Sequence, residues 1–199
     1  IAIGTYQILE HSNTPEEAII TCTAPNVDVI AAHIDLVAIE IELVDKENRE
    51  YMLKQALEKI KDNYDYIIID CAPSLGLITL NALTAADSVI IPIQCEYYAL
   101  EGLGKLLNTI KSVQKIHNPD LDIEGLLLTM FDSRLRLSNQ VVEEVQKHFN
   151  NMLFETSIQR NVKLSEAPSY GESIINYDAT SKGASNYLQL AQEIIKKNI

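Results

Sequence analysis

Apolar residues along this chain follow a helical spacing in some segments and form short unbroken runs in others. Leu53, Ala56, Leu57 and Ile60 stand at the i, i+3, i+4, i+7 positions of an amphipathic helix. The run Tyr66–Asp70 contains three consecutive isoleucines and no polar face, so it predicts a strand buried on both sides of a parallel sheet. A helix followed by a buried strand is the basic unit of an α/β fold.

The same alternation continues along the rest of the chain. We expect further helices over residues 36–44, 76–86, 103–117 and 141–149, the last capped by Ser138, and a final helix over 187–194. We expect further strands over residues 26–32, 88–93, 123–130 and 154–158. Pro92 lacks an N–H and should lie near a strand end or on an unpaired side. The pattern predicts one α/β domain over residues 1–199, with a mostly parallel sheet and helices on both faces.

Asp70 ends the buried run and is followed closely by Pro73, Ser74 and Gly76. In open α/β sheets the ligand crevice lies just beyond the carboxyl ends of the strands, where Asp70 is expected. A carboxylate there can hold Mg²⁺ beside a nucleotide phosphate, and a Pro/Ser/Gly segment after it can move as a nucleotide switch. The simpler alternative is an aspartate that caps the next turn. A receiver-domain phospho-acceptor is a further alternative, but it needs additional acidic residues near the first strand, and we find none placed for that.

A second polar segment, Pro92–Gly102, follows the neighbouring predicted strand and should open on the same crevice. Gln94 and Glu96 could position water or a metal ion there. Considered alone, an ordinary loop with an exposed Glu96 is the simpler interpretation.

The composition restricts the class of protein. A hydrophobic share of 47% in 199 residues suits one domain with a full core and argues against disorder. No apolar run approaches the ~20 residues needed to cross a bilayer. Cys22, Cys71 and Cys95 are odd in number and far apart, which predicts a reduced, cytoplasmic protein without disulfides. The scattered histidines give little support to a zinc site.

The net charge of −12 is unevenly distributed along the chain. Residues 1–70 hold 5 basic and 14 acidic side chains, whereas residues 134–199 hold 8 and 7. An acidic surface repels nucleic acid, so this balance argues against an extensive DNA surface but leaves room for a compact one. The candidate cations are Arg134, Arg136, Arg160, Lys163 and Lys182. For any one of them, solvated surface charge is the simpler interpretation.

Several blocks of the sequence together resemble the ParA/Soj family of partition ATPases. They are Tyr66–Gly76, Asn81-Ala82-Leu83, Pro92–Gly102 with its Gln-x-Glu and Ala-Leu-x-Gly, Leu127–Arg134, Arg160–Ser169, Tyr177-Asp178 and Ser181–Ala184. The similarity runs in order from Ile3 to the C-terminus and so covers nearly the whole chain.

The resemblance implies a P-loop NTPase-like α/β fold with ATP and Mg²⁺ as cofactors. It implies a cytoplasmic, nucleoid-associated ATPase that partitions chromosomes or plasmids, and that forms a homodimer with ATP and binds DNA without sequence preference. A ParB/Spo0J-like stimulating protein is the implied partner, and no membrane association is expected.

The resemblance also implies roles for individual residues in the nucleotide cycle. Asp70 matches the Walker B position and would hold Mg²⁺ through water. The switch residues would be Pro73, Ser74 and Gly76 after it, together with Gln94 and Glu96 after the next strand.

Further roles concern the base and DNA. Met130 and Phe131 match a strand end near the adenine. Gln159, Arg160 and Asn161 match a second loop on the base side, although relatives commonly have Pro at the position of Gln159. The residues implied to border the DNA-facing side of the dimer are Arg160, Lys163 and Lys182.

The sequence departs from the family pattern at its front. The family's opening strand, its Gly-rich phosphate loop and the next strand with its catalytic aspartate are missing, and the chain starts at Ile1 as if cut from something longer. Because that loop holds the triphosphate and offsets its charge, we expect residues 1–199 alone to bind ATP poorly and not to hydrolyse it.

Three alternatives to a partition ATPase remain. One is a truncated, catalytically dead family member that acts as a binding module. Another is a MinD-like membrane-associated ATPase, although the last helix offers only Lys196 and Lys197 for a lipid surface. A nitrogenase-like reductase with a cluster at Cys71 and Cys95 ranks last, because such reductases place their cysteines elsewhere.

Overall fold

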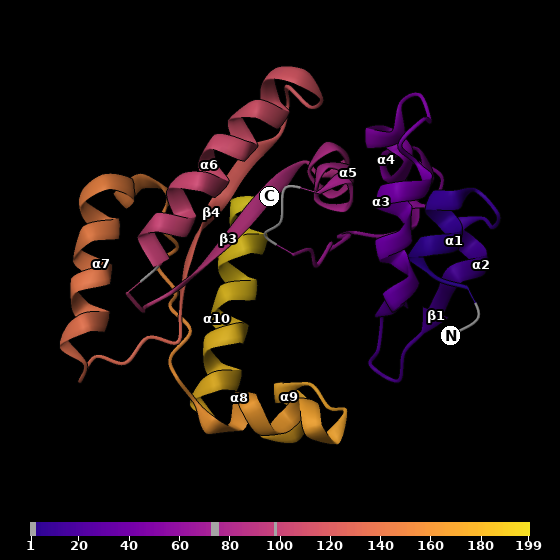
Figure 1. Cartoon of the computed structure of the whole chain (residues 1–199). Helices are drawn as coiled ribbons and strands as arrows, with labels where there is room; N and C mark the ends of the chain where they lie inside the picture. The colour runs from indigo at the N-terminus through magenta and orange to yellow at the C-terminus, as the bar shows by residue number, and fades with distance from the viewer. Residues whose placement is uncertain (1–2, 73–75, 98) are drawn as a thin grey trace. The chain divides into compact units, whose positions relative to one another are not determined.

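The computed structural model describes residues 3–72, 76–97 and 99–199. The chain divides into two compact units, which we describe one at a time (Figure 1). Unit 1 comprises Ile1–Asp87 with Asn108–Leu121, and unit 2 comprises Ser88–Leu107 with Asp122–Ile199.

Unit 1 consists mainly of short helices around small apolar cores. Its elements are α1 (Thr5–Glu10), α2 (Pro15–Ala18), β1 (Ile19–Thr21), β2 (Asp28–Ile30), the 3-10 helix η1 (Ile34–Ala38), α3 (Ile39–Glu42), the 3-10 helix η2 (Arg49–Tyr51), α4 (Met52–Leu57), the 3-10 helix η3 (Lys61–Asn63), α5 (Leu77–Ala85) and the second half of α6 (Ala99–Ile116). Strands β1 and β2 pair antiparallel, with Ile20 opposite Val29. The larger core joins α1, α3 and α4 through Leu9, Ile39, Leu43 and Met52.

Asn81 lies fully buried in α5 and satisfies its amide with backbone groups of three segments. Its Nδ2 donates to the carbonyl oxygens of Arg49, at 2.8 Å, and Leu77, at 3.0 Å. Its Oδ1 accepts from the N–H of Leu53 at 3.0 Å. The first N–H groups of a helix have no partner within that helix, so Asn81 acts as a side-chain cap for the start of α4. It therefore ties α5 to α4 and to η2.

A second buried amide joins the ends of two helices in unit 1. Asn118 follows α6, and its Nδ2 donates to the carbonyl oxygens of Leu83, at 3.1 Å, and Ala86, at 2.8 Å, at the end of α5. The last carbonyls of a helix also lack internal partners, so this amide caps α5 while the chain leaves α6.

The predicted strand Tyr66–Asp70 is wrong. This segment has irregular backbone, and Ile68 is 92% exposed. β-Branched residues form a strand only where neighbouring strands satisfy their backbone groups, and no segment within the described residues pairs with this run. The hydroxyl of Tyr64 does anchor the start of the segment, because it donates to Oδ2 of Asp28 at 2.8 Å.

Unit 2 is organised around two parallel strands, β3 (Ser88–Gln94) and β4 (Asp122–Thr129). Ile91 lies opposite Leu126 and Ile93 opposite Leu128. The other elements are the first half of α6, α7 (Arg136–Phe149), the 3-10 helices η4 (Asn150–Met152) and η5 (Ala167–Tyr170), α8 (Val162–Glu166), α9 (Ile174–Tyr177) and α10 (Lys182–Lys197). The strands predicted over residues 88–93 and 123–130 are confirmed as β3 and β4. The helices predicted over residues 103–117, 141–149 and 187–194 are confirmed as α6, α7 and α10.

Residues 153–160 lie along the other edge of β4. Isolated parallel bridges join Leu126 to Leu153 and Phe131 to Gln159. The N–H of Ile158 also donates to the carbonyl of Leu128 at 2.8 Å. The strand expected over 154–158 is therefore an extended edge with local bridges, and β4 is the central member of this parallel layer.

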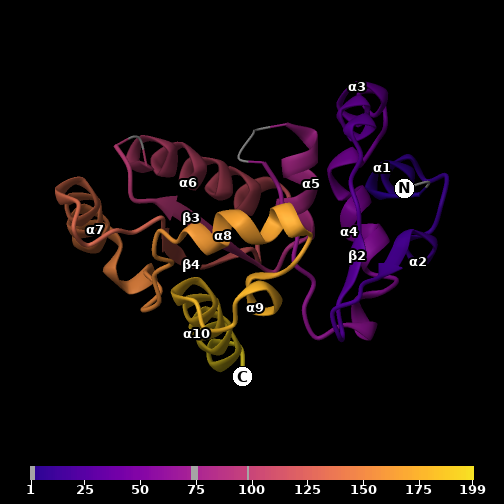
Figure 2. The ribbon, with the colours of Figure 1, turned by 90° about the horizontal axis from the view of Figure 1, so that it is seen from below.

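Helices cover both faces of the layer. The first half of α6 and the helix α10 lie on opposite sides of β3 and β4 (Figure 2). Leu127 of β4 packs with Leu190 of α10, whereas Leu128 lines a pocket with Val142 of α7. Because successive side chains of a strand point to opposite faces, this accounts for the unbroken apolar run of β4. The α/β class with parallel strands is thus confirmed. Within the described residues, no helix is both long and apolar enough to cross a membrane.

Two smaller expectations have opposite outcomes. Ser138 does not cap α7, which begins after Leu135; it is buried, and its Oγ donates to the carbonyl of Cys95 at 3.3 Å. Pro92 lies inside β3. Since the N–H of Cys95 donates to Thr129 of β4 and successive amides alternate in direction, the nitrogen of Pro92 faces away from β4, as predicted.

Replacing Asn81 by Ala should destabilise the protein by about 1–3 kcal/mol, because three partly buried backbone groups would lose their partner. The measurement is the free energy of urea unfolding, followed by circular dichroism. Asn108→Ala, at an exposed position of α6, is the matched control and should change the unfolding midpoint little. Equal midpoints for both variants would contradict the capping role.

Candidate functional site

Three parallel backbone segments of unit 2 end at a common edge. The N–H of Cys95, after β3, donates to the carbonyl of Thr129 at the end of β4, at 3.0 Å. The N–H of Arg160 donates to the carbonyl of Phe131, after β4, at 2.9 Å. The residues that follow β3, β4 and the segment 153–160 therefore share the carboxyl edge of the layer, where ligands bind in open α/β sheets.

Glu96 and Arg160 meet across this edge. Nη2 of Arg160 donates to Oε1 of Glu96 at 3.0 Å, and the two side chains are 51% and 56% exposed. The ion pair connects the third segment to the first and spans the end of β4. The sequence analysis named both residues but gave them separate roles, and the structure brings them together.

Met130 adopts a left-handed backbone conformation immediately after β4, with φ of 53°. This conformation costs a residue with a side chain about 1–2 kcal/mol. Strained backbone of this kind is concentrated at functional sites. The side chain of Met130 is 38% exposed and can contact a ligand at the edge.

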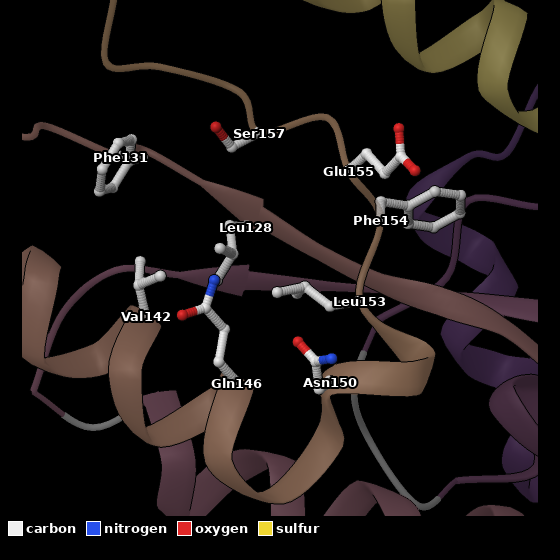
Figure 3. Close-up of a pocket in the computed structure, with 9 residues that line it drawn as sticks. All are labelled: Leu128, Phe131, Val142, Gln146, Asn150, Leu153, Phe154, Glu155 and Ser157. Carbon is white, nitrogen blue, oxygen red and sulfur yellow. The ribbon is translucent and has the colours of Figure 1, made fainter.

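Phe131 lines a pocket of about 440 Å³ in unit 2 (Figure 3). The pocket lies between β4, α7 and the segment after η4, and its other lining residues are Leu128, Val142, Gln146, Asn150, Leu153, Phe154, Glu155 and Ser157. Of the residues expected to contact the base, Phe131 alone belongs to this lining; Met130, Gln159, Arg160 and Asn161 do not. The structure thus places Phe131 against α7 and the others along the edge.

Asp132 and Arg134 form a two-pronged ion pair beside the edge. Nε and Nη2 of Arg134 donate to the two carboxylate oxygens at 2.9 Å and 2.7 Å. These hydrogen bonds, with a smaller effect from the charge of Arg160, lower the pKa of Asp132 to about 2. The carboxylate is therefore ionised under all ordinary conditions, and it compensates the charge of Arg134.

The loop Gln159–Asn161 leads directly into α8. Oδ1 of Asn161 accepts from the N–H of Lys163 at 2.8 Å and caps the helix. Nζ of Lys163 lies 2.9 Å from Oε2 of Glu166 and 5.5 Å from the ring centre of Tyr177. The hydrogen bond that Lys163 donates to Glu166 raises the pKa of Lys163. This lysine is charged but already has an anionic partner.

Lys182 begins α10 and is exposed, and it makes no ion pair with the rest of the described chain. Lys182 and Gln159 both line a polar pocket of about 740 Å³ that extends along α10. The N–H of Gln159 donates to Oδ1 of Asn186 at 3.2 Å, so the base-side loop is attached to the first turns of α10.

Asp70 and Gly76 belong to unit 1. Asp70 is exposed on the irregular segment that was expected to be a strand. Gly76 precedes α5, and a Cβ atom there would overlap the carboxylate of Glu40, so the flexible side chain of Glu40 would have to move to admit any other residue. Pro73 and Ser74 lie outside the described residues.

A metal ion would depend on Asp70 through water. No group of three or more potential metal-ligating side chains occurs within the described residues. A single exposed carboxylate fits a hydrated Mg²⁺, which retains several of its waters in proteins.

The sequence analysis missed the partners of the candidate residues. Asp132 and Glu166 stand two and three positions from their cationic partners, and opposite charges at such spacing were an available signal. Glu40 and Asn186 are far in sequence from Gly76 and Gln159, and no local pattern predicts those contacts.

Comparison with known sequences gives consistent relatives. A family model described as an AAA domain matches residues 2–123. Sporulation initiation inhibitor protein Soj of Bacillus subtilis is 59% identical over 189 residues, which are 95% of this chain and 75% of that protein. Chromosome partitioning protein ParA of Myxococcus xanthus is 52% identical, over 97% of this chain and 68% of its own length.

Solved structures share the fold. Cobyrinic acid a,c-diamide synthase of Mycobacterium smegmatis, with bound ADP and magnesium, is 39% identical with a TM-score of 0.74, over 81% of this chain and 65% of that one. A Borrelia burgdorferi protein assigned to plasmid partition, bound to AMPPNP, is 25% identical with a TM-score of 0.82, over 98% of this chain and 74% of that one. This chain spans slightly less than two thirds of the mycobacterial chain.

The fold is therefore the α/β fold of P-loop NTPases. Given the identity to Soj and ParA over nearly all of its length, the chain belongs to the ParA/Soj family of partition ATPases.

Proposed function

We propose that the protein partitions DNA through a cycle of ATP binding and hydrolysis. The observation that carries this proposal is the 59% identity to Soj over 95% of the chain. The names of these relatives favour partition over the MinD-like alternative. Activity, substrates and partners of the whole protein are part of the proposal, because the chain spans only part of its relatives.

Within this proposal, Asp70 contacts hydrated Mg²⁺ at the nucleotide. The ion would supply positive charge to offset the phosphates. ADP and magnesium bound to the mycobacterial structure support this assignment. Asp70 itself would accept hydrogen bonds from the metal-bound waters through its exposed carboxylate.

The base side would be formed by the carboxyl edge of unit 2. Met130 and Phe131 offer a polarizable and an aromatic surface for a flat ring. The loop Gln159–Asn161 would close over it, held by the hydrogen bond of Gln159 to Asn186. Gln94 and Glu96 would move with the nucleotide state as part of the switch.

DNA binding is the third element of the proposal. An ATP-bound homodimer would contact phosphates without sequence preference, which would place it on the nucleoid, and a ParB/Spo0J-like protein would stimulate hydrolysis. The candidate contacts are Arg160, Lys163 and Lys182. Because Arg160 and Lys163 are already paired with Glu96 and Glu166, the affinity should be low and sensitive to salt.

Asp70→Ala should abolish most Mg²⁺-dependent ATP hydrolysis, with a loss of about 100-fold or more in kcat, since the metal would lose its anchor. The assay measures phosphate release by the protein that carries the complete nucleotide site. Asp65→Ala, an exposed aspartate of the same segment, is the control and should keep near-normal turnover. Equal rates for the two variants would refute the metal role.

A polypeptide of residues 1–199 alone should bind ATP weakly and hydrolyse none of it, because it contains no Gly-rich phosphate loop. Isothermal titration with ATP and Mg²⁺ measures the binding. Micromolar affinity would show that the described residues hold the triphosphate without such a loop.

Arg160→Glu combined with Lys182→Glu should remove DNA binding at low salt, because each change places a carboxylate, which repels phosphate, on the proposed DNA-facing surface. Fluorescence anisotropy with a labelled duplex of mixed sequence measures the affinity. Lys111→Glu combined with Lys147→Glu changes the net charge equally, at exposed positions of α6 and α7. If both pairs of changes weaken binding to the same extent, the loss reflects net charge and the assigned contacts are wrong.

A further inference from the structure

Arg160 is held in an acidic environment at the carboxyl edge. Among the described residues, its side chain makes one hydrogen bond, from Nη2 to Oε1 of Glu96 at 3.0 Å. Its charge also acts on Asp132, although Arg134 provides the larger effect on that carboxylate. A guanidinium group carries five N–H donors in a planar fork, so a single bond to Glu96 uses only a small part of its capacity.

The backbone around Arg160 is fixed, whereas its guanidinium group is accessible. Its N–H donates to the carbonyl of Phe131 at 2.9 Å, which attaches the residue to the end of β4. The side chain is 51% exposed. A phosphate could therefore reach the guanidinium without any rearrangement of the main chain.

The backbone of Glu96 is held by a different set of hydrogen bonds. Its N–H donates to the carbonyl of Gln94 at 2.8 Å, and its carbonyl accepts from the N–H of Ala99 at 3.1 Å. The residue thus occupies a tight turn between β3 and α6. The preceding residue, Cys95, is held by the buried hydroxyl of Ser138. The backbone of Glu96 is therefore positioned by this turn, whereas the backbone of Arg160 is positioned by its hydrogen bond to Phe131 after β4.

We propose that Glu96 is an electrostatic latch that withholds Arg160 from phosphate groups of DNA. This inference rests on the proposed DNA binding and adds a regulation of the same surface. While the turn keeps its present conformation, Arg160 is neutralised by Glu96. When the turn moves, the guanidinium becomes free and can bind a phosphate with two parallel hydrogen bonds, which is the stronger arrangement. The exposed position of both side chains makes the exchange of partners easy.

The latch predicts that Glu96→Gln strengthens DNA binding. Affinity for a labelled duplex of mixed sequence, measured by anisotropy at several KCl concentrations, should rise roughly threefold or more at low salt. The slope of log K against log salt should become steeper by about 0.9, the value for one additional phosphate contact. Glu172→Gln is the matched control: it removes one exposed carboxylate of unit 2 that makes no ion pair with the rest of the described chain, and it should leave the slope unchanged.

Arg160→Gln completes a double-mutant cycle. Alone it should weaken DNA binding much less than it does in the Glu96→Gln background, because Glu96 neutralises Arg160 only when Glu96 is present. Combined with Glu96→Gln, it should remove the whole gain in affinity and the change in slope. Circular dichroism of each variant checks that the fold is retained.

Each other outcome overturns the latch. If Glu96→Gln and Glu172→Gln behave alike, or if the gain persists without Arg160, the effect is one of net charge. If Arg160→Gln weakens binding equally with Glu96 and with Gln at position 96, Glu96 does not withhold Arg160. If the unmodified protein binds DNA and Glu96→Gln leaves it unchanged, only the latch fails. If no folded variant binds DNA, the proposed DNA binding fails with it.

Discussion

Strand β4 shares backbone hydrogen bonds with β3 on one edge and with residues 153–160 on the other, and both of its faces are buried. Gly125 allows this packing, because a Cβ atom there would lie 2.6 Å from the ring of Phe154. A strand surrounded in this way cannot shift its register without exposing its apolar side chains. The residues after all three segments are therefore delivered to one edge, and every feature of the candidate site in unit 2 depends on that alignment.

Three basic side chains of unit 2 are each neutralised by a nearby carboxylate. Arg134 is held by Asp132, Arg160 by Glu96 and Lys163 by Glu166. In a protein with a net charge of −12, free cations would be the exception, and here each of these three has its own carboxylate. To bind phosphate, each of these three cations would first have to leave its carboxylate. Exposed ion pairs contribute little to stability, which makes such an exchange energetically accessible.

In unit 1, local sequence patterns predicted a helix correctly and a strand incorrectly. The helix predicted from Gly76 to Ala86 is present as α5, and its buried Asn81 supplies hydrogen bonds that no periodicity indicates. The isoleucine run before Asp70 has a strong strand propensity, yet it is unpaired within the described residues. Propensity describes how a residue fits a sheet, whereas the sheet itself requires partners on both edges.

From the sequence alone, the α/β class, the strands β3 and β4 and the long helices α6, α7 and α10 could be predicted, because periodicity and apolar runs are properties of neighbouring residues. The family and the candidate residues Asp70, Met130, Phe131 and Arg160 were also accessible from the order of motifs. Only the tertiary structure decided that Tyr66–Asp70 has no strand partner among the described residues, that Ser138 is buried against Cys95 and that Arg160 is paired with Glu96. Hydrogen bonds and ion pairs of this kind join residues far apart in the chain, and their formation depends on the packing that brings those residues together.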